Sequence, residues 1–278
     1  MKYSLSIVIP NYNGRNLLER YLPVTLEVCR KSRRVSEYEV IVADDHSTDD
    51  SLQFLHERFP EVRTVESDTN DGFSRNANRG IRAARYDWLL LLNSDMELTD
   101  TTIDVLMEHC SPDIFGVSCL VKDTTGTKIQ GALNRLTIVR HKINYIDNFS
   151  PTDEGHTMFL CGGLALMNRE KTLRLGGFDE VYSPFYYEDT DLSLRAWQQG
   201  WRCLFTVGTF GFHQHSATVK KNHRQEYVDY ITARNSKLFS YRFTPPITWC
   251  TSGSTSTYTP SRNGYVANNT APIPMPTA

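Results

Sequence analysis

The sequence has no long hydrophobic run. Its densest apolar stretch covers only residues 88–92, far short of the ~20 residues that cross a bilayer as a helix. The pattern of a cleaved signal peptide is also missing, because residues 1–4 lead directly into a strand-like segment. We therefore expect a cytoplasmic protein without a membrane-spanning helix.

The sequence also lacks a large excess of one charge, and it has no closely spaced cysteines. The formal net charge of -2 gives no electrostatic basis for binding a polyanion, which argues against nucleic acid as a partner. The six cysteines are scattered and form no C-x-x-C pair. This argues against a structural zinc site and indicates reduced, mostly buried thiols.

Strand-like and helix-like segments alternate along the chain, which predicts an α/β fold with a parallel or mostly parallel sheet. Strands are expected at residues 5–9, 38–43, 62–66, 88–92, 116–121, 159–167 and 201–207. Helices are expected at residues 14–31, 49–58, 73–84, 101–110, 189–199 and 227–239, with an irregular stretch over 124–157. One domain would cover residues 1–245. Residues 246–278 form a Ser-, Thr- and Pro-rich tail that is predicted to be disordered.

Polar residues recur where the expected strands end, and ligands of open α/β sheets bind beyond the carboxyl ends of strands. Pro10, Tyr12 and Asn13 follow the first strand. Tyr12 could stack on a base, although an ordinary strand-to-helix turn explains the same residues. Asp44 and Asp45 follow the second strand, and one of them could accept a hydrogen bond from the N3–H of a uracil or thymine ring.

The triplet Asn93, Ser94 and Asp95 ends the strand expected at residues 88–92. Its oxygen atoms suit Mg²⁺ or Mn²⁺ held jointly by the protein and a diphosphate, while a capped turn is the simpler interpretation. His213 follows the last expected strand. It could complete a metal site with Asp95, or it could be structural, as most lone histidines are.

Two arginines, Arg75 and Arg79, lie four residues apart in the helix expected at residues 73–84. They share one face of that helix and could meet phosphates or only solvent.

Acidic side chains crowd the segment Glu188, Asp189 and Asp191, just before an apolar helical pattern. Like charges this close repel one another, and a helix N-terminus helps to keep them ionised. An ionised carboxylate at the mouth of a pocket is what a general base requires. The structural alternative is a helix cap with an acidic first turn.

Over residues 4–243 the chain resembles a family 2 glycosyltransferase with the GT-A fold. The segments that carry the resemblance are residues 6–14, 42–49, 72–81, 91–95, 161–163, 176–180 and 188–192. It implies a single Rossmann-like α/β domain with a central, mostly parallel sheet flanked by helices. It also implies inverting transfer of a sugar from a UDP- or dTDP-sugar to a hydroxyl acceptor, in the synthesis of a cell-surface polysaccharide or glycolipid.

The resemblance also implies roles for particular residues. Asp189 would be the base and Glu188 its acidic neighbour. Asp95 and His213 would bind Mg²⁺ or Mn²⁺, with His215 as a second candidate, although Asn93 stands where some members carry Asp. The residues implied at the nucleotide-sugar are Pro10, Tyr12, Asn13, Asp44, Asp45, Arg75, Asn78, Asn93, Ser94, Gly162 and Gly163. Those implied on the acceptor side are Phe178, Asp179 and Tyr187.

Two other functions compete with this hypothesis. A nucleotidyltransferase would want a Gly-rich, basic loop after the first strand, which residues 11–14 do not supply. A catalytically silent member of the family would bind a nucleotide-sugar without turnover. Family members often act on lipid-linked saccharides at the inner face of the plasma membrane, so peripheral membrane contact is a further expectation. The sequence names neither the sugar, the acceptor nor the oligomeric state.

Overall fold

A mixed sheet forms the centre of the molecule in the computed structural model, which describes residues 2–139, 142–146, 152–214, 224–243, 256–261 and 264–267. Its main strands follow the order β10-β12-β6-β11-β4-β1-β2-β3, with β5 paired to β12 and β7 paired to β6. The strands of this sheet are β1 (Tyr3–Asn11), β2 (Val35–Asp44), β3 (Arg63–Glu66), β4 (Trp88–Leu92), β5 (Met96–Leu98), β6 (Ile114–Asp123), β7 (Ile129–Gly131), β10 (Gly155–His156), β11 (Leu164–Asn168) and β12 (Arg202–His213).

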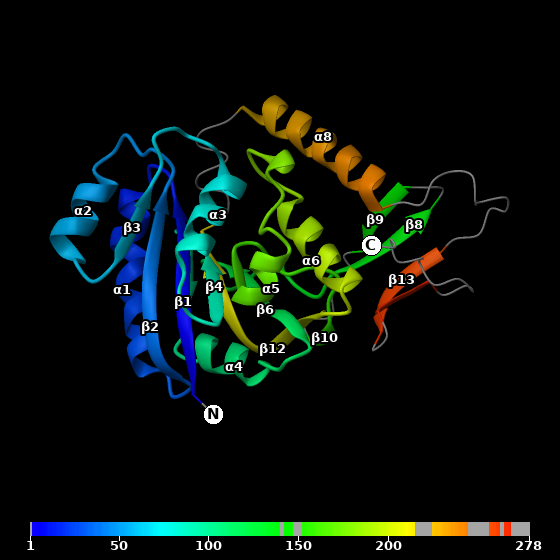
Figure 1. Ribbon diagram of the computed structural model, residues 1–278, viewed down its shortest axis with the longest axis horizontal. Coiled ribbons are helices and arrows are strands. Elements are labelled where there is room, and N and C mark those ends of the chain that lie inside the picture. The colour runs from blue at the N-terminus through cyan, green and yellow to red at the C-terminus, as the bar shows by residue number, and fades with distance from the viewer. Residues whose placement is uncertain are drawn as a thin grey trace.

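Helices cover both faces of this sheet (Figure 1). The helices of the described residues are α1 (Arg15–Lys31), α2 (Ser51–Arg58), α3 (Phe73–Ala83), α4 (Thr102–Glu108), α5 (Arg169–Arg174), α6 (Glu188–Gln198) and α8 (Gln225–Phe243), with a 3₁₀ turn η1 (Glu180–Tyr182). Of these, α8 packs on α6 and η1 rather than on the sheet. None of the helices among the described residues has the length and apolar character needed to cross a membrane.

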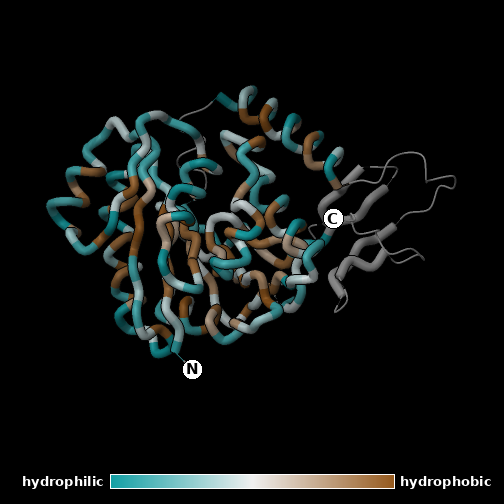
Figure 2. Tube along the Cα trace, in the orientation of Figure 1, coloured by the Kyte–Doolittle hydropathy of each residue, from teal (hydrophilic) through white to brown (hydrophobic). Residues whose placement is uncertain are grey.

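Alternation along the strands divides the core into two layers. Leu90 and Leu92 of β4 pack in the layer with α1, α2 and α4, whereas Leu89 and Leu91 pack in the layer with α3 and α6. All four are at most 1% exposed, as predicted for a strand with a continuous Leu run, because successive side chains of a strand point to opposite faces. Figure 2 shows the same concentration of hydrophobic residues along the central strands.

Strand direction confirms the prediction of a mostly parallel central sheet. β3, β2, β1 and β4 pair in parallel. β11 runs antiparallel to both β4 and β6, so β6 and its parallel partner β12 share the direction of β1. Leu164, at the start of β11, pairs with Leu92, at the end of β4. This reversal brings the segment before β11 to the edge where the parallel strands end.

The prediction of an irregular stretch over residues 124–157 is wrong in part. β7 and β10 extend the main sheet there, and β8 (Arg135–Val139) pairs with β9 (Lys142–Ile146) in a second, four-stranded sheet. Its order is β14-β13-β8-β9. The local pattern of residues 124–157 did not indicate these strands, because strand formation depends on neighbouring strands and burial more than on intrinsic preference.

The other two strands of the second sheet lie in the C-terminal segment. β13 (Ser256–Ser261) pairs antiparallel with β8 and with β14 (Gly264–Ala267). Strand pairing satisfies the backbone groups of these two stretches, and the disorder of the tail over residues 246–278 stays a prediction. The rest of residues 246–278 lies outside the described residues.

A buried ion pair on α6 fixes this helix to its surroundings. Arg195 Nε lies 2.6 Å from Asp191 Oδ2, and the same guanidinium donates hydrogen bonds to the carbonyls of Leu175 (2.6 Å) and Gly177 (2.8 Å). The other carboxylate oxygen of Asp191 accepts from the Tyr182 hydroxyl at 3.2 Å and lies 3.1 Å from Arg242 of α8. Burial raises the pKa of Asp191, and its arginine partners oppose that rise.

Replacing this aspartate should be strongly destabilising. We expect Asp191→Ala to lower the free energy of unfolding by about 3–5 kcal/mol, because it leaves the Arg195 guanidinium buried without its partner. Urea denaturation followed by circular dichroism would measure the change. The matched control is Glu170→Ala, which breaks the i,i+4 pair of Glu170 and Arg174, whose side chains are 72% and 66% exposed. That control should change stability by less than about 0.5 kcal/mol, and equal effects would contradict the prediction.

Candidate active site

The site lies at the edge where the parallel strands end. Asn11, the last residue of β1, is the register partner of Asp44, the last residue of β2. Asn11 Nδ2 donates to Asp44 Oδ2 at 2.8 Å, and the Ser47 N–H donates to Asp44 Oδ1 at 2.8 Å. Asp44 is fully buried. It therefore holds together the two loops that follow β1 and β2.

Asp45 performs a similar task for the start of α3. Its two carboxylate oxygens accept from the backbone N–H groups of Asp71 (3.0 Å) and Gly72 (2.8 Å), and Arg79 lies 3.9 Å away. Burial raises the pKa of Asp45, and these donors pull it back. The carboxylate oxygens of Asp44 and Asp45 thus already accept hydrogen bonds from the protein. A nucleobase N–H would have to share one of these oxygens with the donors already present.

Tyr12 and Pro10 are half-buried at the same edge. Next to them, Asn13 has a left-handed backbone (φ 50°), and its Oδ1 accepts from the N–H groups of Thr48 (2.7 Å) and Asp49 (3.2 Å). The Asn13 side chain is therefore used to join the loops after β1 and β2. Its predicted contact with a nucleotide-sugar stays a prediction, as do those of Pro10 and Tyr12.

Asp95, in the loop between β4 and β5, lies next to His213, the last residue of β12. His213 Nε2 lies 3.2 Å from Asp95 Oδ1, because the end of β12 pairs with β5. The other ring nitrogen, Nδ1, lies 3.0 Å from Gln130 Oε1. An amide oxygen accepts only, so Nδ1 donates a hydrogen bond to Gln130 while Nε2 faces the Asp95 carboxylate. At this distance Nε2 and the carboxylate oxygen are joined either by a proton on Nε2 or by a cation between the two atoms.

A divalent cation fits this pair. A metal-binding imidazole usually donates its second N–H to an oxygen acceptor, as His213 does to Gln130. No cluster of three His, Cys, Asp or Glu side chains suited to a metal occurs among the described residues. A cation between Asp95 and His213 would therefore take further oxygen ligands from water and a diphosphate, as Mg²⁺ commonly does. His215 lies outside the described residues.

Asn93 and Gly163 form the join between β4 and the segment before β11. The Asn93 N–H donates to the Gly163 carbonyl at 2.9 Å, and a Cβ on Gly163 would lie 3.2 Å from Asn93 Nδ2. Asn93 Oδ1 is buried without a hydrogen-bond partner in the structure. Ser94 lies close by, with its Oγ 3.5 Å from the Cβ that Gly14 lacks.

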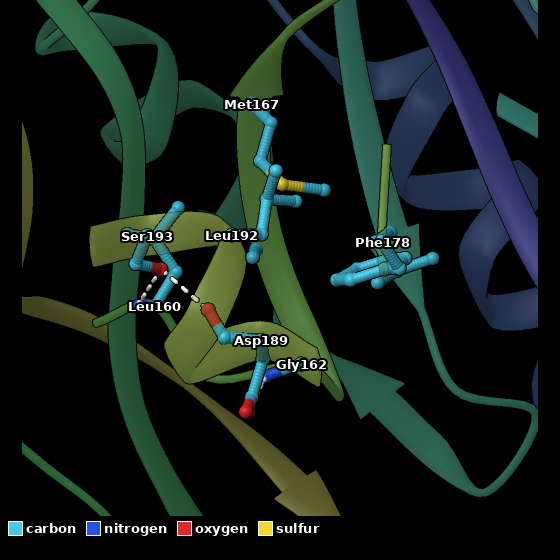
Figure 3. Close-up of a pocket in the computed structure, with 9 residues that line it drawn as sticks. Leu160, Gly162, Met167, Phe178, Asp189, Leu192 and Ser193 are labelled. Atoms are coloured by element: carbon cyan, nitrogen blue, oxygen red, sulfur yellow. Dashed lines mark hydrogen bonds between the residues drawn. The ribbon is translucent and has the colours of Figure 1, made fainter. Parts of the chain in front are cut away.

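Asp189 is the second residue of α6 and faces Gly162 (Figure 3). Its Oδ2 accepts from the Gly162 N–H at 3.1 Å, and its Oδ1 accepts from the Thr190 N–H at 2.6 Å. The Asp189 carbonyl accepts a hydrogen bond from the Ser193 hydroxyl (2.8 Å). The same hydroxyl accepts one from the Leu160 N–H (3.1 Å). Behind the carboxylate lies a small cavity of about 10 Å³, lined mainly by apolar side chains.

The environment of the acidic pair favours proton uptake. Burial raises the pKa of Asp189, and the N–H donors of Thr190 and Gly162 oppose the rise. Glu188 is 6% exposed, and its Oε2 has no hydrogen-bond partner. Burial, together with the charge of Asp189, raises the pKa of Glu188 well above its ordinary value. The two carboxyl groups titrate as a pair.

Two residues predicted for the site, Asn78 and Phe178, are buried and hydrogen-bonded to each other. Asn78 is 2% exposed, and its amide both donates to the Phe178 carbonyl and accepts from the Phe178 N–H, each at 2.8 Å. Phe178 is 2% exposed. Neither side chain reaches the surface in this structure, and the predicted roles of Asn78 at the donor and Phe178 at the acceptor stay predictions.

The remaining predicted residues are more accessible. Asp179 caps η1 and pairs with Arg242, which lowers its pKa. Arg75 is 52% exposed and pairs with Glu180 at 3.1 Å. Tyr187 packs on Phe239 of α8 with ring centroids 5.6 Å apart. Of these three, only the exposed Arg75 offers an accessible charge to a phosphate.

Sequence reasoning missed the partners that hold the acidic segment. Asp191 and Arg195 stand four residues apart, a spacing that favours an ion pair on a helix, so this signal was present. Asn235 was a second signal, because it falls in the buried series with Val228, Ile231 and Phe239 on α8. A polar side chain in an apolar helical face marks a buried hydrogen-bonding role.

Solved structures share this fold. The mannosyltransferase PcManGT from Pyrobaculum calidifontis, in complex with GDP-Man and Mn²⁺, gives a TM-score of 0.64 at 18% identity, over 88% of this chain and 67% of its own. GalNAc-T7 with UDP, GalNAc and Mn²⁺ gives 0.60 at 17% identity, over 76% of this chain and 44% of its own. These likenesses define the GT-A glycosyltransferase fold.

Sequence comparison gives the family. The family model described as "Glycosyl transferase family 2" matches residues 6–176, and the chain belongs to that family. The N-acetylglucosaminyl-diphospho-decaprenol L-rhamnosyltransferase of Mycobacterium tuberculosis is 25% identical over 90% of this chain and 90% of its own length. The chondroitin synthase of Escherichia coli is 24% identical over 76% of this chain, which spans 34% of that protein.

Gly162 should tolerate no side chain. A Cβ there would lie 3.1 Å from Asp189 Oδ2 and 3.2 Å from Asp189 Cβ, so Gly162→Ala would displace the carboxylate. We expect kcat for glycosyl transfer to fall at least about tenfold, since small misplacements of reacting groups reduce rates strongly. The matched control is Gly208→Ala, whose Cβ would meet the side chains of Val105 and Thr206 at 3.1 and 3.4 Å. Equal kcat values for the two variants would refute the prediction.

Proposed function

We propose that the protein is an inverting glycosyltransferase that moves a sugar from a UDP- or dTDP-sugar to a hydroxyl group of a saccharide acceptor. The observation that carries this proposal is the position of Asp189, held by the Gly162 N–H at the strand edge where Asp95 and His213 also lie. A base and a cation-binding pair on one edge suit a reaction that removes a proton and releases a diphosphate.

In the proposed reaction, Asp189 takes the proton of the acceptor hydroxyl while that oxygen forms a bond to the anomeric carbon. The bond from this carbon to the diphosphate oxygen breaks, and its electron pair leaves with the nucleoside diphosphate. Burial supports this role, because a carboxylate with a raised pKa is a stronger base. A divalent cation at Asp95 and His213 would supply positive charge to the departing diphosphate.

Glu188 would act beside the base rather than as a second base. Its raised pKa keeps it protonated at pH values where an ordinary glutamate is ionised. A neutral Glu188 would leave the negative charge of the pair on Asp189. This division of protonation between neighbouring carboxyl groups is how one site holds both an acid and a base.

The acceptor side is proposed from the relatives. The mycobacterial relative is named for a saccharide on decaprenyl diphosphate, and the Escherichia coli relative for chondroitin synthesis. We propose a saccharide or lipid-linked saccharide acceptor in the assembly of a cell-surface polysaccharide or glycolipid. The inner face of the plasma membrane would be the place of contact. On α8, Tyr230 and Tyr241 are 64% and 85% exposed, and tyrosine is common at membrane surfaces.

Substitution of Asp189, the proposed base, distinguishes an active enzyme from a catalytically silent family member. We expect Asp189→Asn to reduce the rate of transfer about 10²–10⁴-fold, the range that general-base catalysis contributes, while donor binding stays within about twofold. Initial rates with a UDP- or dTDP-sugar and calorimetric titration of the nucleotide would measure the two quantities. Wild-type protein that binds donor but transfers nothing to any saccharide acceptor would support the silent member instead.

Removing the proposed metal ligand should abolish metal-dependent nucleotide binding. Calorimetry with UDP, dTDP and GDP, each with and without Mn²⁺, should show binding of a pyrimidine nucleotide that Mn²⁺ strengthens. Asp95→Ala should lose this gain, because one carboxylate ligand is gone. Asp104→Ala, at the opposite end of the strands, is the control and should keep the gain. Metal-independent binding of equal strength in wild type and Asp95→Ala would contradict the proposed site.

A further inference from the structure

The backbone just before the acidic pair is held in an unfavourable conformation. Tyr186 and Tyr187 have φ angles of 72° and 77°, in the left-handed region that L-residues with bulky side chains rarely adopt. Such strain persists only where the surroundings enforce it, and it clusters at functional sites. The next residues in the chain are Glu188 and Asp189.

Asn235 of α8 supplies the enforcing contacts. Its Nδ2 donates to the carbonyls of Tyr182 (2.8 Å), Phe185 (2.9 Å) and Tyr186 (2.8 Å). Asn235 is fully buried, so these carbonyls would have no water to replace it. Its Oδ1 accepts from Arg234 Nε at 2.9 Å, and Arg234 also donates to the Ser183 carbonyl.

The same loop contacts the start of α3. The Phe73 N–H donates to the Pro184 carbonyl at 2.9 Å, next to Gly72, whose own N–H binds Asp45. The loop of residues 182–187 is thus fixed from α8 on one side and from α3 on the other. Among these contacts, the hydrogen bond from Asn235 to the Tyr186 carbonyl is the nearest in sequence to Glu188 and Asp189.

We propose that Asn235 is a positioning residue for catalysis, which sets the orientation of Asp189 by holding the backbone of residues 182–186. This inference rests on the proposed role of Asp189 as the base. Asn235 lies on α8, beyond the residues 6–176 that the family model matches. The helix therefore acts on the site through the loop, without contributing a group that touches the reacting atoms.

The test compares Asn235→Ala and Asn235→Asp with wild type. The Asp variant keeps the shape of the side chain but puts an oxygen where the amide donated. We expect kcat to fall at least about tenfold in both variants, with KM for the donor within about twofold, because the donor side at Asp95 and His213 is untouched. Hydrogen exchange should show faster exchange in residues 183–191, while β1 and β4 keep their protection.

Asp104→Ala is the matched control for a purely structural effect. Asp104 of α4 also holds a loop, the one between α1 and β2, through a single side chain. Its carboxylate accepts hydrogen bonds from the Ser32 hydroxyl and from the N–H groups of Arg33 and Arg34. Its loop lies at the opposite end of the strands, so kcat should stay within about twofold even if the melting temperature falls as much as in the Asn235 variants.

Three results would overturn the inference. They are an unchanged kcat in Asn235→Asp, a fall in kcat that Asp104→Ala reproduces at equal loss of stability, and a rise in donor KM without a fall in kcat. A wild-type protein without transfer activity would instead overturn the proposed function. In that case the exchange measurement still decides whether Asn235 holds residues 183–191.

Discussion

The antiparallel course of β11 is the constraint on which the site depends. It runs against β4, so Leu164 pairs with Leu92 and the glycines before it arrive where β4 ends. Gly163 then accepts from the Asn93 N–H, and Gly162 donates to Asp189. An entirely parallel sheet would place that segment at the opposite edge, because parallel strands begin together and end together. Gly162 would then lie a strand length away from the Asp95–His213 pair, and could not hold Asp189, the proposed base, beside it.

Three neighbouring acidic residues differ because their surroundings differ. Asp191 is paired with Arg195 and Arg242, whereas no ion pair with a basic side chain is found for Glu188 or Asp189 within the described part of the chain. Asp189 has backbone donors, and Glu188 Oε2 has none. Asp191 thus serves the packing of α6 through its ion pairs, whereas the proposed acid–base role falls to Glu188 and Asp189.

Much of the fold could be predicted from local pattern. The Leu run of β4 and the alternation of strands with helices gave the α/β class and the strand ends, because burial periodicity is a local property. The resemblance then located Asp95, His213 and Asp189. The pairing of Asp95 with His213 is present at 3.2 Å. The hydrogen bonds between Asn78 and the Phe178 backbone could not be predicted, because an amide that binds a ligand and one that binds backbone look alike in sequence.

The sequence by itself determined the family, the mostly parallel arrangement of the sheet and the chemical kinds of side chain at the strand ends. Motif spacing and hydrophobic periodicity carry this information, because they depend only on residues that are near one another in the chain. Tertiary structure alone decided which groups meet. It joined Gln130 to His213, and Asn235 to the loop before Asp189, across 83 and about 50 residues of chain. It also set the proton affinity of Glu188 and Asp189, because burial and hydrogen-bond donors come from segments that only folding brings together.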